Sequence, residues 1–156
     1  MAYDKNIMMR TLELAIRNID EAGGPFAAVV VKDGVVVSES GNRVTANNDP
    51  TAHAEVLAIR EAAKKLKTYD LSGCEIYTSC EPCPMCLGAI YWAHIGTVYY
   101  AGNSDDAKTA GFDDSFIYKE LKLEPKYRNV KMCSMERTEG RKVFEKWLKK
   151  DDRVEY

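Results

Sequence analysis

Two short segments of the chain combine the residue types that hold a catalytic metal ion. His53 and Glu55 lie two residues apart in the first segment, and Cys83 and Cys86 lie three apart in the second. Side chains three residues apart share one face of a helix, so the two thiolates can bind a single ion. A helix N-terminus carries partial positive charge, which favours the thiolate form that a metal requires. The spacing therefore predicts a metal site built on Cys83 and Cys86, close to His53.

Prolines indicate where the two supporting helices should begin. Pro82 comes directly before Cys83, and a proline is tolerated at a helix start because the first N–H groups have no partners there. Asp49 and Pro50 form a similar start for a helix that we expect to run to about Lys67. We expect both helices to aim their first turns at one ion.

The first of these helices carries a carboxylate on its apolar face. Glu55, Ile59, Ala62 and Leu66 follow a helical period, whereas the charged residues of the segment fall on the other side. An unpaired buried carboxylate would cost several kcal/mol. Something polar must therefore meet Glu55 in the folded protein.

The two motifs resemble the zinc-dependent nucleobase and nucleoside deaminases. The chain has His-x-Glu at residues 53–55 and Pro-Cys-x-x-Cys at residues 82–86, in the order that this family uses. The resemblance implies one zinc ion (Zn2+) per chain, held by His53, Cys83 and Cys86 with water in the fourth position.

The resemblance also assigns roles to the residues around the metal. Glu55 is not a ligand in this pattern but moves protons during a hydrolytic deamination. The alternative is a closed structural zinc site with Cys80 as the fourth ligand, in a module that binds a partner. We weight that alternative less because it leaves Glu55 buried without a purpose.

Longer blocks narrow the resemblance to bacterial guanine deaminases. These blocks are residues 49–55, 77–93 and 110–118, and deaminases that edit transfer RNA carry a different segment in place of the third. The resemblance implies hydrolysis of guanine to xanthine and ammonia by a homodimer, with the exchange of C-terminal segments between subunits left open. A tRNA adenosine deaminase and a deaminase of another aminopurine, an aminotriazine or a nucleoside remain the alternatives.

The substrate contacts are also implied by this resemblance. Asp114 would accept hydrogen bonds from the N–H groups of guanine, and Asn42 would read the edge of the base. Phe26 and Trp92 are candidates for stacking on the base, although either is equally well explained as a core residue. The family ends its chain with an aromatic residue that reaches the pocket, and Tyr156 keeps that pattern.

Length and composition limit the compartment and the partners. The chain has 156 residues, which fit one domain, and we expect a single deaminase domain over residues 1–156. Its net charge of −2 gives no general attraction to nucleic acid or to an anionic membrane. The five cysteines are an odd number and three are crowded at the motif, which favours a reduced, cytoplasmic protein. No run is apolar enough to span a bilayer.

Strands and helices alternate in the order expected of right-handed crossovers on a sheet. The expected strands lie near residues 26–31, 35–39, 75–78, 98–101 and 129–134, and the expected helices near residues 4–22, 49–67, 83–93 and 143–148. The first strand is apolar without alternation, so it should be covered on both faces. The order also resembles the deaminase fold, which implies an α/β protein with three α/β/α layers and a central five-stranded mixed sheet.

Several other residues have simple structural explanations. We expect Glu81 to make structural hydrogen bonds, and Cys74 and Cys133 to fill small apolar spaces in strands. His94 should be a cap or surface residue. The basic residues in the segment 141–150 are expected to form the solvated face of the last helix rather than a nucleic-acid contact.

Overall fold

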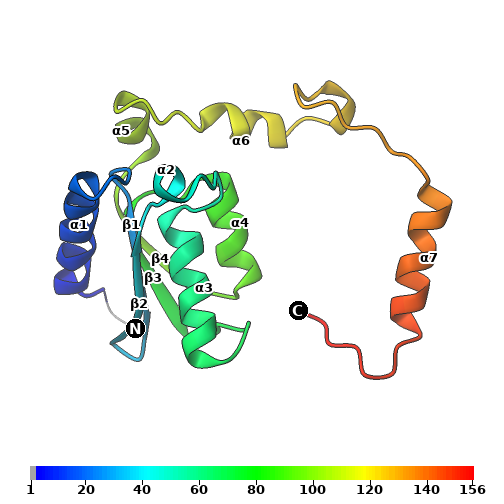
Figure 1. Cartoon of the computed structure of the whole chain (residues 1–156), viewed down its shortest axis with the longest axis horizontal. Helices are drawn as coiled ribbons and strands as arrows, with labels where there is room; N and C mark the ends of the chain where they lie inside the picture. The colour runs from blue at the N-terminus through cyan, green and yellow to red at the C-terminus, as the bar shows by residue number, and fades with distance from the viewer. Residues whose placement is uncertain (1–2) are drawn as a thin grey trace. The chain divides into compact units, whose positions relative to one another are not determined.

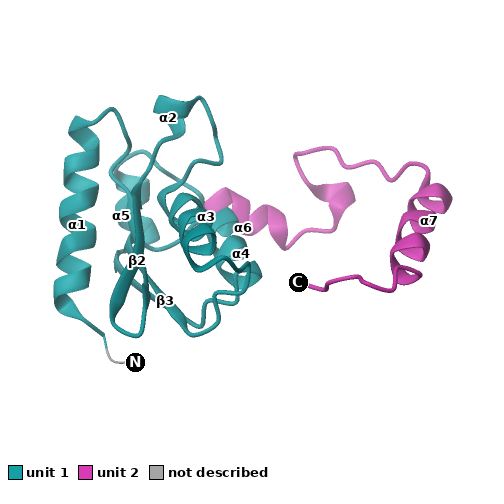
Figure 2. Cartoon of the chain, turned by 60° about the horizontal axis from the view of Figure 1, so that its bottom comes forward, with its two compact units in different colours: residues 1–114 teal, residues 115–156 magenta. Residues whose placement is uncertain are grey.

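The computed structural model describes residues 3–156, which divide into two compact units (Figure 2). The first unit ends at Asp114 and contains the whole sheet. The second unit contains helices α6 (Ser115–Leu121) and α7 (Arg137–Leu148) with a 3-10 turn, Pro125–Tyr127, between them. Within residues 3–156, no helix has the length and apolar character that crossing a membrane would need.

A mixed sheet forms the centre of the first unit. Its four strands are β1 (Ala27–Lys32), β2 (Val35–Gly41), β3 (Cys74–Cys80) and β4 (Thr97–Gly102), in the order β2-β1-β3-β4. The strand β1 pairs antiparallel with both of its neighbours, and β3 pairs parallel with β4. The α/β fold with a mixed sheet is thereby confirmed, and four of the expected strands are found.

The fifth predicted strand, near residues 129–134, is not a strand. This segment belongs to the second unit, where the backbone N–H of Asn129 donates to the Glu120 carboxylate over 2.7 Å. The side-chain amide of Asn129 donates to the same carboxylate over 3.0 Å. The Glu120 side chain therefore accepts the hydrogen bond that the backbone of a neighbouring strand would accept in a sheet. Cys133, expected as an apolar filler in this strand, is exposed.

The two faces of the sheet are covered by different helices (Figure 1). On one face, α1 (Lys5–Asp20) packs Ile7 and Met8 against Val29 and Val31 of β1. On the other face, the alternate residues of β1 pack against α3 (Ala54–Leu66) and α4 (Pro84–Trp92). Burial of β1 on both sides confirms the prediction made from its unbroken apolar run.

Helix α3 approaches the sheet through alanines. Ala54, Ala58 and Ala62 have no exposed surface, whereas Ile59 and Leu66, expected on the apolar stripe, are only half-buried. Small side chains allow close packing, and the hydroxyl of Ser38 in β2 donates directly to the Ala58 carbonyl over 2.7 Å. The position of α3 relative to the sheet is thus set by methyl groups.

Short helices connect the sheet to the loops around the site. The expected helices did not include α2 (Val44–Asn47) or α5 (Ser104–Thr109), which are only four and six residues long. Asn103 and Asp106 begin α5 with a reciprocal capping box. In α1, Ile19 is exposed although it is apolar, and the neighbouring Asn18 is buried.

Candidate active site

His53 lies at the start of α3, at a place the sequence did not predict. The helix begins at Ala54 with His53 as its N-cap, four residues after the expected start. Asp49 does not cap the helix but closes a turn of its own, since its side chain accepts from the Thr51 N–H over 2.8 Å and from the Thr51 hydroxyl over 2.7 Å. The extended backbone at His53 directs its ring away from the helix and toward the cysteines.

The two cysteines lie at the start of α4. Cys83 is the N-cap and Pro84 occupies the first turn, so Pro84 rather than Pro82 is the proline that begins this helix. The strand β3 ends at Cys80 and delivers the chain directly to this turn. The prediction that both sulfurs lie at a helix N-terminus is confirmed.

The side chains of His53, Cys83 and Cys86 bring three metal-binding atoms together. Their donor atoms all lie within 4.8 Å of one another, and His53 Nδ1 lies 3.6 Å from Cys83 Sγ and 3.5 Å from Cys86 Sγ. Tetrahedral zinc, with Zn–S of about 2.3 Å and Zn–N of about 2.0 Å, separates a sulfur from a nitrogen ligand by about 3.5 Å. Both the donor set and its spacing therefore fit one zinc ion.

The charges of these groups also favour a cation. The Cys86 thiol and His53 donate hydrogen bonds to the Cys83 sulfur, and they hold its pKa down to about 4 against the opposite effect of burial. The pKa of Cys86 is raised, because its thiol is the donor to Cys83 and is itself buried. The Cys83 thiolate in turn raises the pKa of His53. A metal ion bound by these three groups would replace the hydrogen bonds between them.

Glu55 is the buried carboxyl beside this cluster. It occupies the first turn of α3 and is 8% exposed, as the sequence predicts. Burial raises its pKa, and the nearby negative charge of Cys83 acts in the same direction. A carboxyl whose neutral form is favoured in this way is suited to both accepting and donating a proton.

Cys80 is not part of the cluster. The metal-binding group found within residues 3–156 contains His53, Cys83 and Cys86 without Cys80. The Cys80 thiol instead donates to the Asn103 carbonyl over 3.4 Å, and burial raises its pKa to about 11. This arrangement does not support the closed four-ligand site and leaves the fourth position of the metal open.

A cavity of about 450 Å³ opens beside the cluster, a size within the range of small-molecule sites. His53, Glu55 and Cys83 form its floor. The rest of the lining consists of Gly23, Gly24, Phe26, Asn42, Val44, Thr45, Glu81, Phe112 and Asp114. The cavity thus joins the metal-binding atoms, a proton carrier and an apolar wall in one space.

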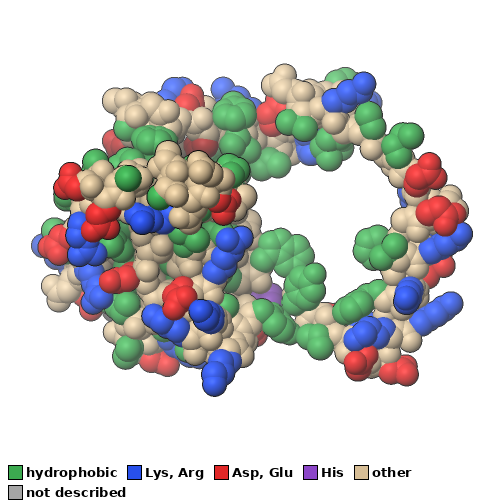
Figure 3. Space-filling model, in the orientation of Figure 1, with side chains coloured by type: hydrophobic (Ala, Val, Ile, Leu, Met, Phe, Trp, Pro, Cys, Tyr) green, Lys and Arg blue, Asp and Glu red, His purple; other side chains and the backbone are tan. Residues whose placement is uncertain are grey.

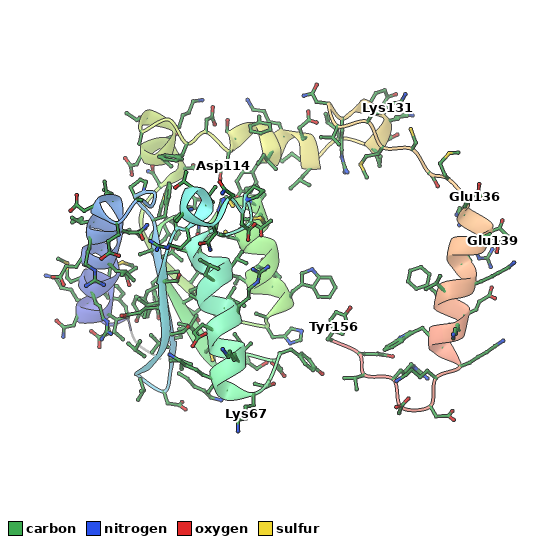
Figure 4. The ribbon with its side chains drawn as sticks, viewed as in Figure 1. Lys67, Asp114, Lys131, Glu136, Glu139 and Tyr156 are labelled. Atoms are coloured by element: carbon green, nitrogen blue, oxygen red, sulfur yellow. The ribbon has the colours of Figure 1, made fainter. Side chains whose placement is uncertain are left out.

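Three of the predicted substrate residues lie on this lining. Asp114 lies at the end of the sheet where α3 and α4 begin (Figure 4), and burial raises its pKa, as does the charge on Cys83. Asn42 is buried, and its side-chain oxygen accepts from the Val44 N–H over 3.2 Å, which fixes its orientation. The ring of Phe26 completes the set.

The remaining aromatic predictions have different outcomes. Trp92 does not line the cavity, because it lies at the far end of α4 with 66% of its surface exposed. Phe112 lines the cavity in its place, with its ring perpendicular to that of Phe26 and the two centroids 4.9 Å apart. Tyr156 ends the second unit, and its role in binding stays a prediction.

Two residues with expected structural roles also lie near the site. Glu81 accepts from the Ser104 N–H over 3.1 Å, which confirms that it makes a structural hydrogen bond at the start of α5. His94 is a surface residue, whose Nδ1 lies 3.4 Å from an Asp70 carboxylate oxygen. Neither arrangement adds a fourth protein ligand to the cluster.

The sequence did not single out Phe112, Val44, Thr45 or the pair Gly23 and Gly24 as cavity residues. Phe112 lies two residues before Asp114 in one of the blocks used for the resemblance, and that neighbourhood was the available indication. Val44 and Thr45 belong to the short helix α2, whose length is too small to produce a periodic pattern. Gly23 and Gly24 follow the end of α1, where glycines are common for reasons of backbone conformation alone.

Comparison with known proteins agrees with this geometry. Residues 1–102 match the family described as the cytidine and deoxycytidylate deaminase zinc-binding region. The chain is 49% identical over 153 residues to a guanine deaminase of Bacillus subtilis strain 168, a match that covers 97% of this chain and 98% of that protein. A tRNA-specific adenosine deaminase of Aquifex aeolicus is 42% identical over 90 residues, 58% of this chain and 60% of that protein.

The similarity extends to a solved structure. An X-ray structure of guanine deaminase from Bacillus subtilis superposes with a TM-score of 0.96 at 48% sequence identity. The superposition covers 99% of each chain, so it includes the second unit as well as the sheet. The match to the tRNA-specific deaminase, in contrast, covers little more than half of this chain.

Proposed function

The chain belongs to the cytidine and deoxycytidylate deaminase zinc-binding family, and on this premise we propose that it hydrolyses guanine to xanthine and ammonia. The observation that carries the proposal is the cavity in which Asp114 and Asn42 face the His53, Cys83 and Cys86 cluster. The similarity to a guanine deaminase over almost the whole chain supports the same substrate.

The chain's residues divide the chemistry between them. When bound by His53, Cys83 and Cys86, zinc supplies a Lewis acid that makes a water molecule nucleophilic near neutral pH. Glu55 takes a proton from the attacking water and delivers it to a ring nitrogen of the base, and it then carries the proton of the added hydroxyl to the departing amine. The raised pKa of Glu55 suits both directions of transfer. Water adds to the base and ammonia leaves, which accounts for every atom of the reaction.

The polar groups of the lining select the base. A carboxylate at Asp114 accepts hydrogen bonds from the N–H groups of guanine, whereas adenine and cytosine present a different pattern at the corresponding edge. Asn42 has both a donor and an acceptor for the other edge. The perpendicular rings of Phe26 and Phe112 give the cavity an apolar wall against which a planar base can pack.

We infer a homodimer from surfaces that a single copy leaves uncovered. In α7 the apolar residues lie on one face of the helix and the charged residues on another (Figure 3), and Val143, Phe144 and Leu148 are all exposed. No residue from 115 to 156 is buried in the single chain. Exposed apolar surface of this extent is typical of protein contacts, and exchange of the second unit between two copies would cover it.

The remaining assignments follow from the same proposal. Within the dimer, Tyr156 is the aromatic residue that we assign to substrate contact, and the exposed Trp92 is assigned to the interface instead of the cavity. Both units are then parts of a single deaminase domain. All five cysteines are free, which fits a protein of the reducing cytoplasm.

Ammonia release from a panel of substrates tests the proposal. The panel contains guanine, guanosine, adenine, cytosine, an aminotriazine and a tRNA anticodon stem-loop, each given to the zinc-loaded protein. We expect turnover on guanine that exceeds turnover on every other compound and changes little with salt. Activity confined to RNA, falling steeply between low and moderate salt, would favour the editing alternative and overturn the proposal.

A further inference from the structure

One buried amide connects three segments around the cavity. Asn18 lies in the last turn of α1 and is 3% exposed. Its Nδ2 donates to the carbonyl of Gly24 over 2.8 Å and to the carbonyl of Asn42 over 2.9 Å. The backbone carbonyl of Asn18 accepts a hydrogen bond from the N–H of Gly23 over 2.9 Å. A single residue therefore joins the end of α1, the loop after it and the end of β2.

Both side-chain acceptors belong to residues of the cavity. Gly24 and Asn42 line it, whereas Asn18 itself does not. The N–H of Asn42 donates to the carbonyl of Phe26 over 2.9 Å, so the same connection continues to the aromatic wall. The position of the Asn42 side chain in the cavity thus depends on a hydrogen bond made behind it, outside the lining.

The chain around Asn18 leaves room for this amide and little more. A Cβ added at Gly23 or at Gly41 would overlap the Asn18 side chain. Both hydrogens of the Asn18 amide nitrogen make hydrogen bonds. A side chain without this amide would leave the carbonyls of Gly24 and Asn42 without their hydrogen-bond donor. The Asn18 side chain can therefore keep this position only if residues 23 and 41 are both glycine.

We propose that Asn18 is a positioning residue for base recognition, whose amide holds Asn42 and the loop of Gly23 and Gly24 at the spacing that the base requires. The inference rests on the proposed function, since it concerns the same cavity. Asn18 acts through Asn42 and Gly24 and does not contact the metal ligands. Its loss should therefore impair substrate binding while leaving zinc and the proton carrier Glu55 in place.

Asn18→Asp is the test, because it keeps the shape but turns a carboxylate oxygen toward two carbonyl oxygens. We expect the KM for guanine to rise by about ten- to a hundredfold, the effect typical of a misplaced binding group, while kcat stays within about threefold. Zinc content should remain one per chain. Asn18→Ser, which is smaller and neutral, should change KM in the same direction and serves as the second measurement if Asn18→Asp does not fold.

Thr11→Val is the matched control. Thr11 is also a buried polar residue of α1, and its hydroxyl donates to the Ile7 carbonyl over 2.8 Å, with no connection to the cavity. Its replacement should lower the unfolding temperature without changing KM. A merely structural role for Asn18 predicts that its variants behave like Thr11→Val, with lower stability and an unchanged KM, and this result would overturn the inference.

A double-mutant cycle with Asn42→Ala identifies the route. If Asn18 acts through Asn42, the effect of Asn18→Asp on KM should be at least about threefold smaller in the Asn42→Ala background. Fully additive effects would overturn the inference. A wild-type protein that releases no ammonia from guanine would refute the proposed function and the inference together. An active wild type with an unchanged KM in Asn18→Asp would refute the inference alone.

Discussion

Replacing Glu55 by glutamine isolates the proton chemistry of the site. The change keeps the shape of the side chain and most of its hydrogen bonds, but an amide cannot carry a proton between water and the base. Glu55 is 8% exposed and lies two residues from His53, so no bulk water can easily replace it. We expect kcat for guanine to fall while zinc remains bound.

The size of the loss follows from the lack of a substitute among the cavity residues. The two other carboxyls of the lining are Glu81, which is bound to the Ser104 N–H, and Asp114, which we assign to the base. Loss of a positioned general acid and base costs about 10²- to 10⁴-fold. This corresponds to about 3 to 6 kcal/mol of transition-state stabilisation at about 1.4 kcal/mol per decade.

The assay is steady-state ammonia release, with zinc measured on the same samples. Glu81→Gln is the matched control, since it makes the same chemical change on a carboxyl that binds a backbone N–H, and its loss should be at least tenfold smaller. Turnover of Glu55→Gln within tenfold of the wild type, with zinc retained, would show that another group moves the proton.

A second measurement on the same variant follows the buried charge. Burial raises the pKa of Glu55 in the metal-free protein, so its protonated form is favoured by folding. The contribution of protonated Glu55 to the free energy of unfolding is fully present below the unfolded pKa of about 4.3. It is lost as the pH rises through the folded pKa. After zinc is removed, Glu55→Gln should therefore unfold at a higher temperature than the wild type at pH 8, and the difference should vanish near pH 4.

Three further predictions concern the thiols and the base. Cys80→Ser should keep one zinc per chain by metal analysis and Cys83→Ser should lose it, and equal loss in both would support a closed structural site. Asp114→Ala should lower kcat/KM for guanine by about 10² or more with fold and zinc unchanged, as circular dichroism and metal analysis would show; unchanged guanine kinetics would refute the assignment. Iodoacetamide at pH 7.5 should modify Cys133 first in the zinc-loaded protein, because Cys133 is exposed. After zinc is removed with a chelator, Cys83 should also be modified, because its pKa is held near 4. Mass spectrometry can identify the modified cysteines.

The two cysteines of the metal cluster were predictable because their spacing is a local requirement of one ion. His53 lies far from them in the sequence, and its role as a ligand came from the resemblance to the deaminase family. The burial of β1 followed from composition in the same way. For the two cysteines and for β1, one short segment contains both the residues that produce the structural feature and the pattern from which it is predicted.

The failed predictions involve partners that are distant or compete locally. Asp49 has the type and spacing of a helix cap, but its side chain is used by the turn at Thr51. Asn129 lies in an apolar-polar run typical of a strand, yet the Glu120 carboxylate takes its N–H. Asn18 is buried in α1 although it is polar, because its partners are the carbonyls of Gly24 and Asn42, which no helical periodicity can indicate.

The alanine face of α3 has a consequence for how the protein can change over evolutionary time. Ala54, Ala58 and Ala62 leave no space for a larger side chain, and added methylene groups in a filled core cost about 1 to 3 kcal/mol. A larger side chain on this face would displace the first turn of the helix, and His53 with it. Residues 110–113 are exposed, and this segment contains none of the three metal ligands. One fixed reaction centre can in this way be retained while the surrounding loops adapt to a new base.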